Sequence, residues 1–222
     1  MWKITKQTQV MEVSLKEHRS RVWSIQVSKD NKQAVSASSD GSCILWDIKK
    51  HHRLLCMFET TAFKQAMLNS EEYQVLTVGS DRKISYWEKF DGQIIRSVEG
   101  SEKELNTLDI TAEGKHFVSG GQDGILRIWN YDEGICYFAG EGHSGSINKL
   151  KISPDQRRIV TVGSEGAVFL WEMPECIVKD RVEPELPTLT KHEKVEDKSV
   201  KGSVKSSVKG SVKGSVKGSV KK

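Results

Sequence analysis

The sequence predicts an all-β protein made of repeated four-stranded sheets that stack as the blades of a β-propeller. Three observations support this prediction: tryptophans at nearly constant spacing, an acidic turn before each of them, and columns of apolar residues that keep register in four copies. A single four-stranded sheet cannot bury both of its faces, so successive sheets are expected to stack around a channel.

The repeat is marked by four tryptophans separated by 41, 42 and 42 residues, which is the period of WD repeats. An acid lies six residues before each tryptophan and a hydroxyl lies ten residues before it, and three of the acids precede a glycine that suits a tight hairpin turn. The copies align as Trp46, Trp87, Trp129 and Trp171; Asp40, Asp81, Asp123 and Glu165; Ser36, Thr77, Ser119 and Thr161; with apolar columns Val22, Phe63, Leu105 and Ile147; Ile25, Ala66, Leu108 and Leu150; and Val27, Leu68, Ile110 and Ile152.

The expected fold is a partial WD-repeat β-propeller over residues 1–173, with four full four-stranded blades and a partial N-terminal blade. The blades are expected at about 16–58, 59–99, 100–140 and 141–173, after the partial blade at 1–15. Trp2 lies 44 residues before Trp46 and resembles the end of an earlier blade, so we expect the C-terminal part of a larger ring. The alternative is that residues 8–14 add an outer strand to the fourth blade and close a small ring.

The open ring predicts association, because unpaired strand edges recruit other strands. We therefore expect either self-association or a partner that completes the propeller.

The C-terminal residues have a different composition from the blades. Residues 174–197 hold three of the four prolines and are expected to be a linker, and residues 198–222 repeat Lys-Gly-Ser-Val. This last segment has eight lysines and no acid, whereas the whole chain has a net charge of +4, so the body is mildly acidic. Without aromatic residues the segment cannot bury enough apolar area to fold, and we expect a disordered tail.

Histidines in the first and fourth copies complete a pattern that is typical of WD-repeat proteins. Such a histidine links the turn acid, the hydroxyl and the indole in one hydrogen-bonded network, and Glu59 and Ser101 take its place in the two middle copies. By this resemblance, the expected structural tetrads are His18, Ser36, Asp40 and Trp46 in the first blade, and His143, Thr161, Glu165 and Trp171 in the fourth.

Two sequence motifs resemble those of catalytic or phosphate-binding sites. His18, Ser36 and Asp40 have the residue types of a serine hydrolase, but their recurrence at fixed offsets favours a structural role. A Gly-x-Gly-x-x-Gly pattern begins at Gly140, yet a strand follows it, whereas phosphate binding requires a helix. The sequence therefore predicts no enzyme, no cofactor and no metal site.

The cysteines and the hydropathy of the sequence predict in which compartment the protein is found. The four cysteines form no C-x-x-C pair and are expected to be reduced and mostly buried. No apolar run has the roughly 18 residues that a membrane span requires. We expect a soluble intracellular protein that binds neither membrane nor specific nucleic acid.

Protein partners are expected on the rim formed by the loops between blades and the turns before the tryptophan strands. The residue after the first apolar column is Trp23 in the first blade, which is predicted either to be an interaction hot spot or to pack against a neighbouring blade. Cations surround the same rim, and the predicted partner-binding residues are Trp23, Arg19, Arg21, Lys64, Arg82 and Lys83.

Several stretches resemble the cilia- and flagella-associated protein 52 family, among them KEHRSRV, SDGSCILWDI, GSDRKISYWEKFDGQIIRSVEGS, DITAEGKHFVSGGQDG and GHSGSINKLKISP. The resemblance covers roughly residues 1–173. It implies a structural, non-catalytic scaffold inside the doublet microtubules of motile cilia and flagella, with tubulin and other axonemal inner-junction proteins as partners. The implied location is the cytoplasm, cytoskeleton and axoneme. The alternative is a general WD-repeat adaptor that presents a peptide or partner to a ubiquitin ligase or a signalling complex.

Overall fold

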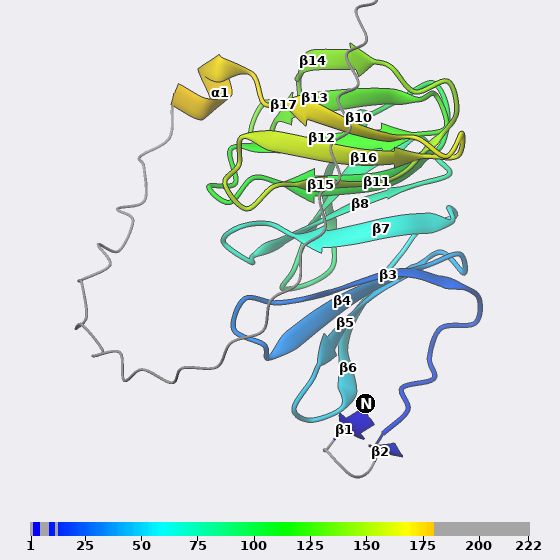
Figure 1. Cartoon of the computed structure of the whole chain (residues 1–222). Coiled ribbons are helices and arrows are strands. Elements are labelled where there is room, and N and C mark those ends of the chain that lie inside the picture. The colour runs from blue at the N-terminus through cyan, green and yellow to red at the C-terminus, as the bar shows by residue number, and fades with distance from the viewer. Residues whose placement is uncertain (1, 5–8, 12, 180–222) are drawn as a thin grey trace, which may run out of the picture. The chain divides into compact units, whose positions relative to one another are not determined.

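The computed structural model describes residues 2–4, 9–11 and 13–179. In this part the chain forms strands β1 to β17 and one short helix, α1, so the predicted all-β repeat fold is confirmed (Figure 1). The predicted tail at 198–222 and most of the predicted linker at 174–197 lie outside the described residues.

Four antiparallel sheets follow one another along the chain, and each is a meander of consecutive strands. Blade 1 contains β3 (Val22–Val27), β4 (Gln33–Ser38), β5 (Ser42–Asp47) and β6 (His52–Phe58); blade 2 contains β7 (Phe63–Leu68), β8 (Gln74–Gly79), β9 (Lys83–Glu88) and β10 (Ile94–Glu99); blade 3 contains β11 (Leu105–Ile110), β12 (His116–Gly121), β13 (Ile125–Asn130) and β14 (Cys136–Glu141); blade 4 contains β15 (Ile147–Ile152), β16 (Arg158–Gly163) and β17 (Val168–Glu172).

Blade 4 differs from the prediction of four full blades, because only three strands form it in the described residues. In the described residues, β17 is followed by helix α1 (Glu175–Lys179), which begins after Pro174, and no outer strand follows. Met173 and Ile177 pack into the core of blade 4, so the packed region extends beyond the predicted end at 173. At the other end, β1 (Trp2–Ile4) and β2 (Gln9–Met11) form a two-stranded sheet.

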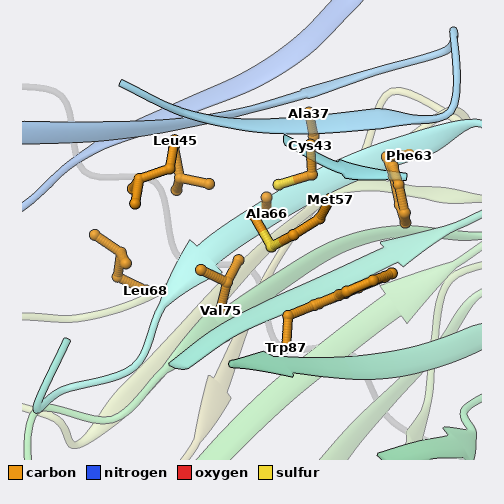
Figure 2. Packing of buried hydrophobic residues seen from close by; sticks show 10 residues of the cluster. Ala37, Cys43, Leu45, Met57, Phe63, Ala66, Leu68, Val75 and Trp87 are labelled. Atoms are coloured by element: carbon orange, nitrogen blue, oxygen red, sulfur yellow. The ribbon is translucent and has the colours of Figure 1, made fainter. Parts of the chain in front are cut away.

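The hydrophobic core lies between successive blades. Figure 2 shows the junction of blades 1 and 2, where the inner face of one sheet meets the first strand and the tryptophan of the next. The predicted apolar columns supply the first-strand residues at each junction. This cluster consists of Val35, Ala37, Cys43, Leu45 and Met57 from blade 1 and Phe63, Ala66, Leu68, Val75 and Trp87 from blade 2.

Polar side chains on the first strand of a blade bond to the first strand of the next blade. Ser24 Oγ accepts the Ala66 N–H at 3.2 Å, and Gln26 Oε1 accepts the Leu68 N–H at 2.7 Å. Between blades 3 and 4, Asp109 accepts the N–H of Ile152. Alternation along each first strand therefore places apolar residues in the core and polar residues toward the neighbouring backbone.

The outer edges of the junctions are closed in different ways. Between blades 2 and 3, the guanidinium of Arg96 donates to the carbonyl oxygens of Tyr131 and Asp132 and lies 4.1 Å from the ring centroid of Tyr86. Leu55 occupies the position of Arg96 in blade 1, since Leu55 pairs with Leu45 as Arg96 pairs with Tyr86. The first junction thus has an apolar contact where the second has a hydrogen-bonded clamp.

One of the four cysteines is buried, contrary to the expectation that most are. Cys43 lies in the core, whereas Cys56, Cys136 and Cys176 are exposed free thiols. Cys56 and Cys136 lie on the outer strands β6 and β14, where the inward and outward faces could not be assigned from the repeat columns.

The indole of every blade's tryptophan donates to the hydroxyl ten residues earlier. These bonds measure 2.7–2.9 Å and pin the third strand of each blade to its second strand. The four pairs are Trp46 with Ser36, Trp87 with Thr77, Trp129 with Ser119, and Trp171 with Thr161.

The histidine of blade 1 extends this bond into a network. His18 Nε2 lies 2.7 Å from Ser36 Oγ, and His18 Nδ1 lies 2.8 Å from Ser42 Oγ and 3.4 Å from the Asp40 carboxylate. Burial acts to raise the pKa of Asp40, but hydrogen bonds from Ser42 and from the Arg19 N–H outweigh it, so the pKa lies well below its ordinary 3.8. Ser42, which bridges histidine and acid, was not predicted from the sequence.

The corresponding positions differ in the other blades. In blade 4, His143 contacts the Glu165 carboxylate and Thr161, and the hydrogen bond from His143 lowers the pKa of Glu165. In blade 2, Glu59 stands in the place of histidine, and its Oε2 has no hydrogen-bond partner among the described residues. Burial, followed by the charge of Asp81, raises the pKa of Glu59.

Replacement of His18 or Asp40 by alanine should lower the free energy of unfolding by about 1–3 kcal/mol each, because buried partners lose their hydrogen bonds. A double-mutant cycle measured by denaturant unfolding should show coupling above roughly 0.5 kcal/mol.

Asp91→Ala is the control, because Asp91 is an acid of an exposed turn that accepts a bond from the Gln93 N–H. Its effect should stay within about 0.5 kcal/mol. Additive, near-zero effects of His18→Ala and Asp40→Ala would contradict the network.

Candidate protein-interaction site

The candidate site is centred on Trp23, which follows the first residue of β3 at the rim of blade 1. Its side chain is 42% exposed, and its Nε1 donates to Ser39 Oγ in the turn between β4 and β5. This hydrogen bond fixes the ring, so the indole is presented as a rigid exposed surface. An exposed and oriented tryptophan suits a binding hot spot.

Two of the predicted cations contact the Trp23 ring. The guanidinium carbon of Arg21 lies 4.8 Å from the ring centroid, and Lys64 Nζ from blade 2 lies 4.3 Å from it. Such cation–π contacts contribute roughly 0.5–1 kcal/mol at exposed sites. The structure thus brings Trp23, Arg21 and Lys64 together, and we call these three residues the Trp23 cluster.

The Trp23 cluster continues toward blade 3 through an acid. Lys64 Nζ lies 4.0 Å from Glu104 Oε2, and Gln122 donates to the same carboxylate at 2.9 Å. Glu104 precedes the first apolar column of blade 3 and was not predicted as a site residue, because a lone acid in a loop gives no signal. Since the cluster holds two cations and the acid lies beside only Lys64, the cluster remains suited to an acidic ligand.

The other three predicted residues lie apart from the Trp23 ring. The Arg19 N–H donates to the Asp40 carboxylate, which ties the loop before β3 to the turn before β5. Arg82 lies in the corresponding turn of blade 2, and Lys83 is the first residue of β9. Arg82 has a φ of 66° at the place where blades 1, 3 and 4 have glycine, so its backbone adopts a conformation that is uncommon for a side chain.

Within residues 13–179, no group of histidine, cysteine and acidic side chains could hold a metal ion. In the described part of the chain, no helix is long and apolar enough to cross a membrane. The chemistry that the rim offers is an aromatic surface flanked by cations, which suits binding rather than bond cleavage.

Comparison with known proteins gives the repeat family. The WD domain, G-beta repeat family matches residues 9–47, 92–130 and 134–172. The tryptophan of blade 2 lies outside these matches, and blade 2 has Glu59 in place of the histidine and Arg82 in place of the glycine. The structure nevertheless gives blade 2 the same four strands as its neighbours.

The predicted resemblance to the cilia- and flagella-associated protein 52 family is confirmed. The proteins of that name from Homo sapiens and Macaca fascicularis are 48% identical over 122 residues, and the one from Chlamydomonas reinhardtii is 43% identical over 122 residues. Each alignment covers 54% of this chain and 20–21% of the relative. The chain thus spans about a fifth of the length of these relatives. Because the repeat matches cover more than half of its residues, the chain belongs to the WD domain, G-beta repeat family.

Proposed function

We propose that this protein is a non-catalytic scaffold of motile cilia and flagella that binds the microtubule doublet from its inner side. The observation that carries the proposal is the similarity to relatives named cilia- and flagella-associated protein 52 in both mammals and a green alga. Identity of 43–48% is well above what the spacing of a WD repeat alone requires, since the repeat fixes only a few positions in each copy.

The Trp23 cluster supports an acidic protein partner. Arg21 and Lys64 leave N–H groups that can bind carboxylates, while the exposed indole edge offers apolar contact. The surface of tubulin is acidic, so tubulin is the partner that this surface fits. The loops hold these groups on rigid blades, so little ordering is needed when a partner binds.

A tagged form of the full chain, expressed in ciliated cells, should be confined to the axoneme. Fluorescence microscopy after detergent extraction measures this, because a structural microtubule protein resists extraction. Diffuse cytosolic or nuclear signal that is lost on extraction would favour the general WD-repeat adaptor instead.

Replacement of Trp23 by alanine should weaken binding of the full chain to microtubules about fivefold, which corresponds to about 1 kcal/mol. The double variant Arg21→Ala with Lys64→Ala should have a similar effect, because it removes both cations that contact the ring. Co-sedimentation across a range of tubulin concentrations gives the dissociation constants.

Lys115→Ala is the matched control, since Lys115 is an exposed cation in the turn between β11 and β12, at the opposite end of the strands. It should bind as tightly as the unchanged chain. Equal affinity of all three variants would remove the Trp23 cluster from the proposed interface.

The lysine-rich segment at 198–222 should add a weak and salt-sensitive attraction to the same acidic surface. Each lysine contributes little, because screening acts over about 8 Å at physiological salt, but attachment to a bound propeller raises its local concentration. A variant that ends at Lys198 should therefore bind microtubules more weakly than the full chain at low salt. The difference should disappear as salt is raised.

The control for this measurement is a variant in which the lysines of 201–222 are replaced by glutamine, which keeps the length and removes the charge. It should behave like the shortened variant. If the full chain and both variants share one salt dependence, this segment takes no part in binding.

A further inference from the structure

An open groove lies at the outer edge of the junction between blades 1 and 2, at the end of the strands opposite the Trp23 cluster. It has a volume of about 470 Å³, which is within the range of pockets that bind ligands. Its lining is mostly apolar and includes Gln33, Leu45, Leu54 and Leu55 of blade 1 and Tyr73 and Phe90 of blade 2. We call this surface the outer groove.

The outer groove is open because the side chain that fills the same place at the next two junctions is replaced here. The residue two positions after the tryptophan is Tyr131 in blade 3 and Met173 in blade 4, and these side chains are 6% and 4% exposed. In blade 2 this residue is Lys89, whose Nζ donates to the Glu72 carbonyl of the same blade at 2.8 Å. Lys89 is therefore held by its own blade and does not fill the space beside blade 1.

The backbone follows the same path at the open and the filled junction, so the difference lies in the side chains. The Lys89 N–H donates to the carbonyl oxygen of Tyr73 at 3.0 Å. In blade 3 the Tyr131 N–H donates to the equivalent carbonyl oxygen, that of Lys115, at 2.8 Å. The outer groove is thus the place of Tyr131 without its side chain.

The walls that remain are apolar. Leu55 stands where Arg96 closes the next junction, and Leu54 is the extra residue of a bulge in β6. Leu54 is 41% exposed, and Phe90, in the turn between β9 and β10, is 92% exposed. An apolar groove with an exposed aromatic residue at its edge suits the anchor residue of a protein partner.

Tyr131 shows which side chain fits such a place. Its ring lies 5.4 Å from the Tyr86 ring between centroids, and its hydroxyl donates to Gln74 Oε1 at 2.6 Å. In blade 1 the equivalent residues are Leu45 and Gln33. The bonds that Gln33 makes to Ser28 use its backbone groups, so its side-chain oxygen is available to accept a hydroxyl.

The turns of blade 2 beside the outer groove are acidic. Residues 69–73 and 88–93 hold one cation, Lys89, and the four acids Glu71, Glu72, Glu88 and Asp91. Glu88 lines the groove, and its Oε1 accepts only a long bond of 3.5 Å from the Phe90 N–H. A carboxylate with so weak a bond is suited to a cation of a partner.

We propose that the outer groove binds a segment of a partner protein that inserts a tyrosine between blades 1 and 2, with basic residues on both sides of that tyrosine. The tyrosine ring takes the place that Tyr131 has at the next junction, and its hydroxyl donates to Gln33. The flanking cations face Glu88 and the acidic turns.

This second site goes beyond microtubule binding and does not depend on it. The outer groove and the Trp23 cluster lie at opposite ends of the strands and attract ligands of opposite charge. One chain can therefore hold two different partners at the same time, which is what a scaffold requires.

Binding of short peptides to the full chain tests the proposal. The probe is the blocked peptide Gly-Lys-Tyr-Lys-Gly, and two comparison peptides have alanine in place of tyrosine or glutamate in place of both lysines. NMR of the methyl-labelled chain follows each titration, because the methyl groups of Leu54 and Leu55 line the groove. The probe should shift these signals. The alanine peptide should bind about tenfold more weakly, and the glutamate peptide about fivefold more weakly at low salt.

Two substitutions of Lys89 separate the space in the groove from its charge. Lys89→Tyr should fill the groove as Tyr131 fills its own junction, so the probe should bind about tenfold more weakly and the Tm should rise. Lys89→Ala removes the same cation but leaves the groove open, so it should bind the probe more tightly than the unchanged chain. Equal affinity of these two variants would overturn the proposal.

Leu54→Ala and Ile95→Ala are a matched pair, because the two residues have the same position in blades 1 and 2 and are 41% and 48% exposed. Leu54→Ala should weaken binding of the probe about fivefold, whereas Ile95→Ala should leave it unchanged, since Ile95 lies beside the filled junction. Thermal unfolding checks that both variants are folded, so this pair decides the question even if Lys89→Tyr does not fold.

Three further results would refute the site. The first is equal affinity for the probe and the alanine peptide, and the second is the absence of saturable binding. The third is a set of methyl shifts that leaves Leu54 and Leu55 unchanged, because the probe would then bind elsewhere on the chain.

Discussion

The bond from each tryptophan indole to a hydroxyl on the adjacent strand is the interaction on which the rest of the fold depends. It occurs in all four blades, including the two that lack the histidine. The same side chain also fills the core: Trp87 and Trp129 both belong to clusters between blades. Because the bond satisfies the only polar atom of the indole, the ring can be buried without an unpaired donor. Strand pairing and blade packing are thereby fixed by one residue in each copy.

Blade packing in turn decides which surfaces are available for partners. Loops at one end of the strands are held by bonds between blades, so side chains such as Trp23 and Lys64 meet across a junction although they are far apart in sequence. A partner that binds there contacts two blades at once. The interface is accordingly a property of the stack, and an isolated blade would not form it.

The repeat columns allowed strand order, apolar faces and tryptophan partners to be predicted, since each follows from a period that four copies share. The side-chain contacts that occur in only one blade could not be predicted in the same way. Ser42 bridges His18 and Asp40 because a serine happens to follow the turn glycine of blade 1, and Glu104 reaches Lys64 from a different blade. In the described residues, blade 4 has helix α1 after β17 where the other blades have an outer strand, and the repeat columns gave no sign of this helix. Positions unique to one copy carry no period, so only the structure shows what they contact.

The contacts at the outer edges of the junctions differ, so the junctions should differ in how strongly they resist separation. The Arg96 clamp joins blades 2 and 3 by two hydrogen bonds and a ring contact, whereas Leu55 offers only dispersion at the equivalent place between blades 1 and 2. In a linear stack of repeats, the total stability is close to the sum of the stabilities of the single units and of the contacts between neighbours. Force applied along the stack therefore opens the weakest junction first. At their outer edge, blades 2 and 3 should therefore resist separation more than blades 1 and 2, and the clamped pair should move as one block.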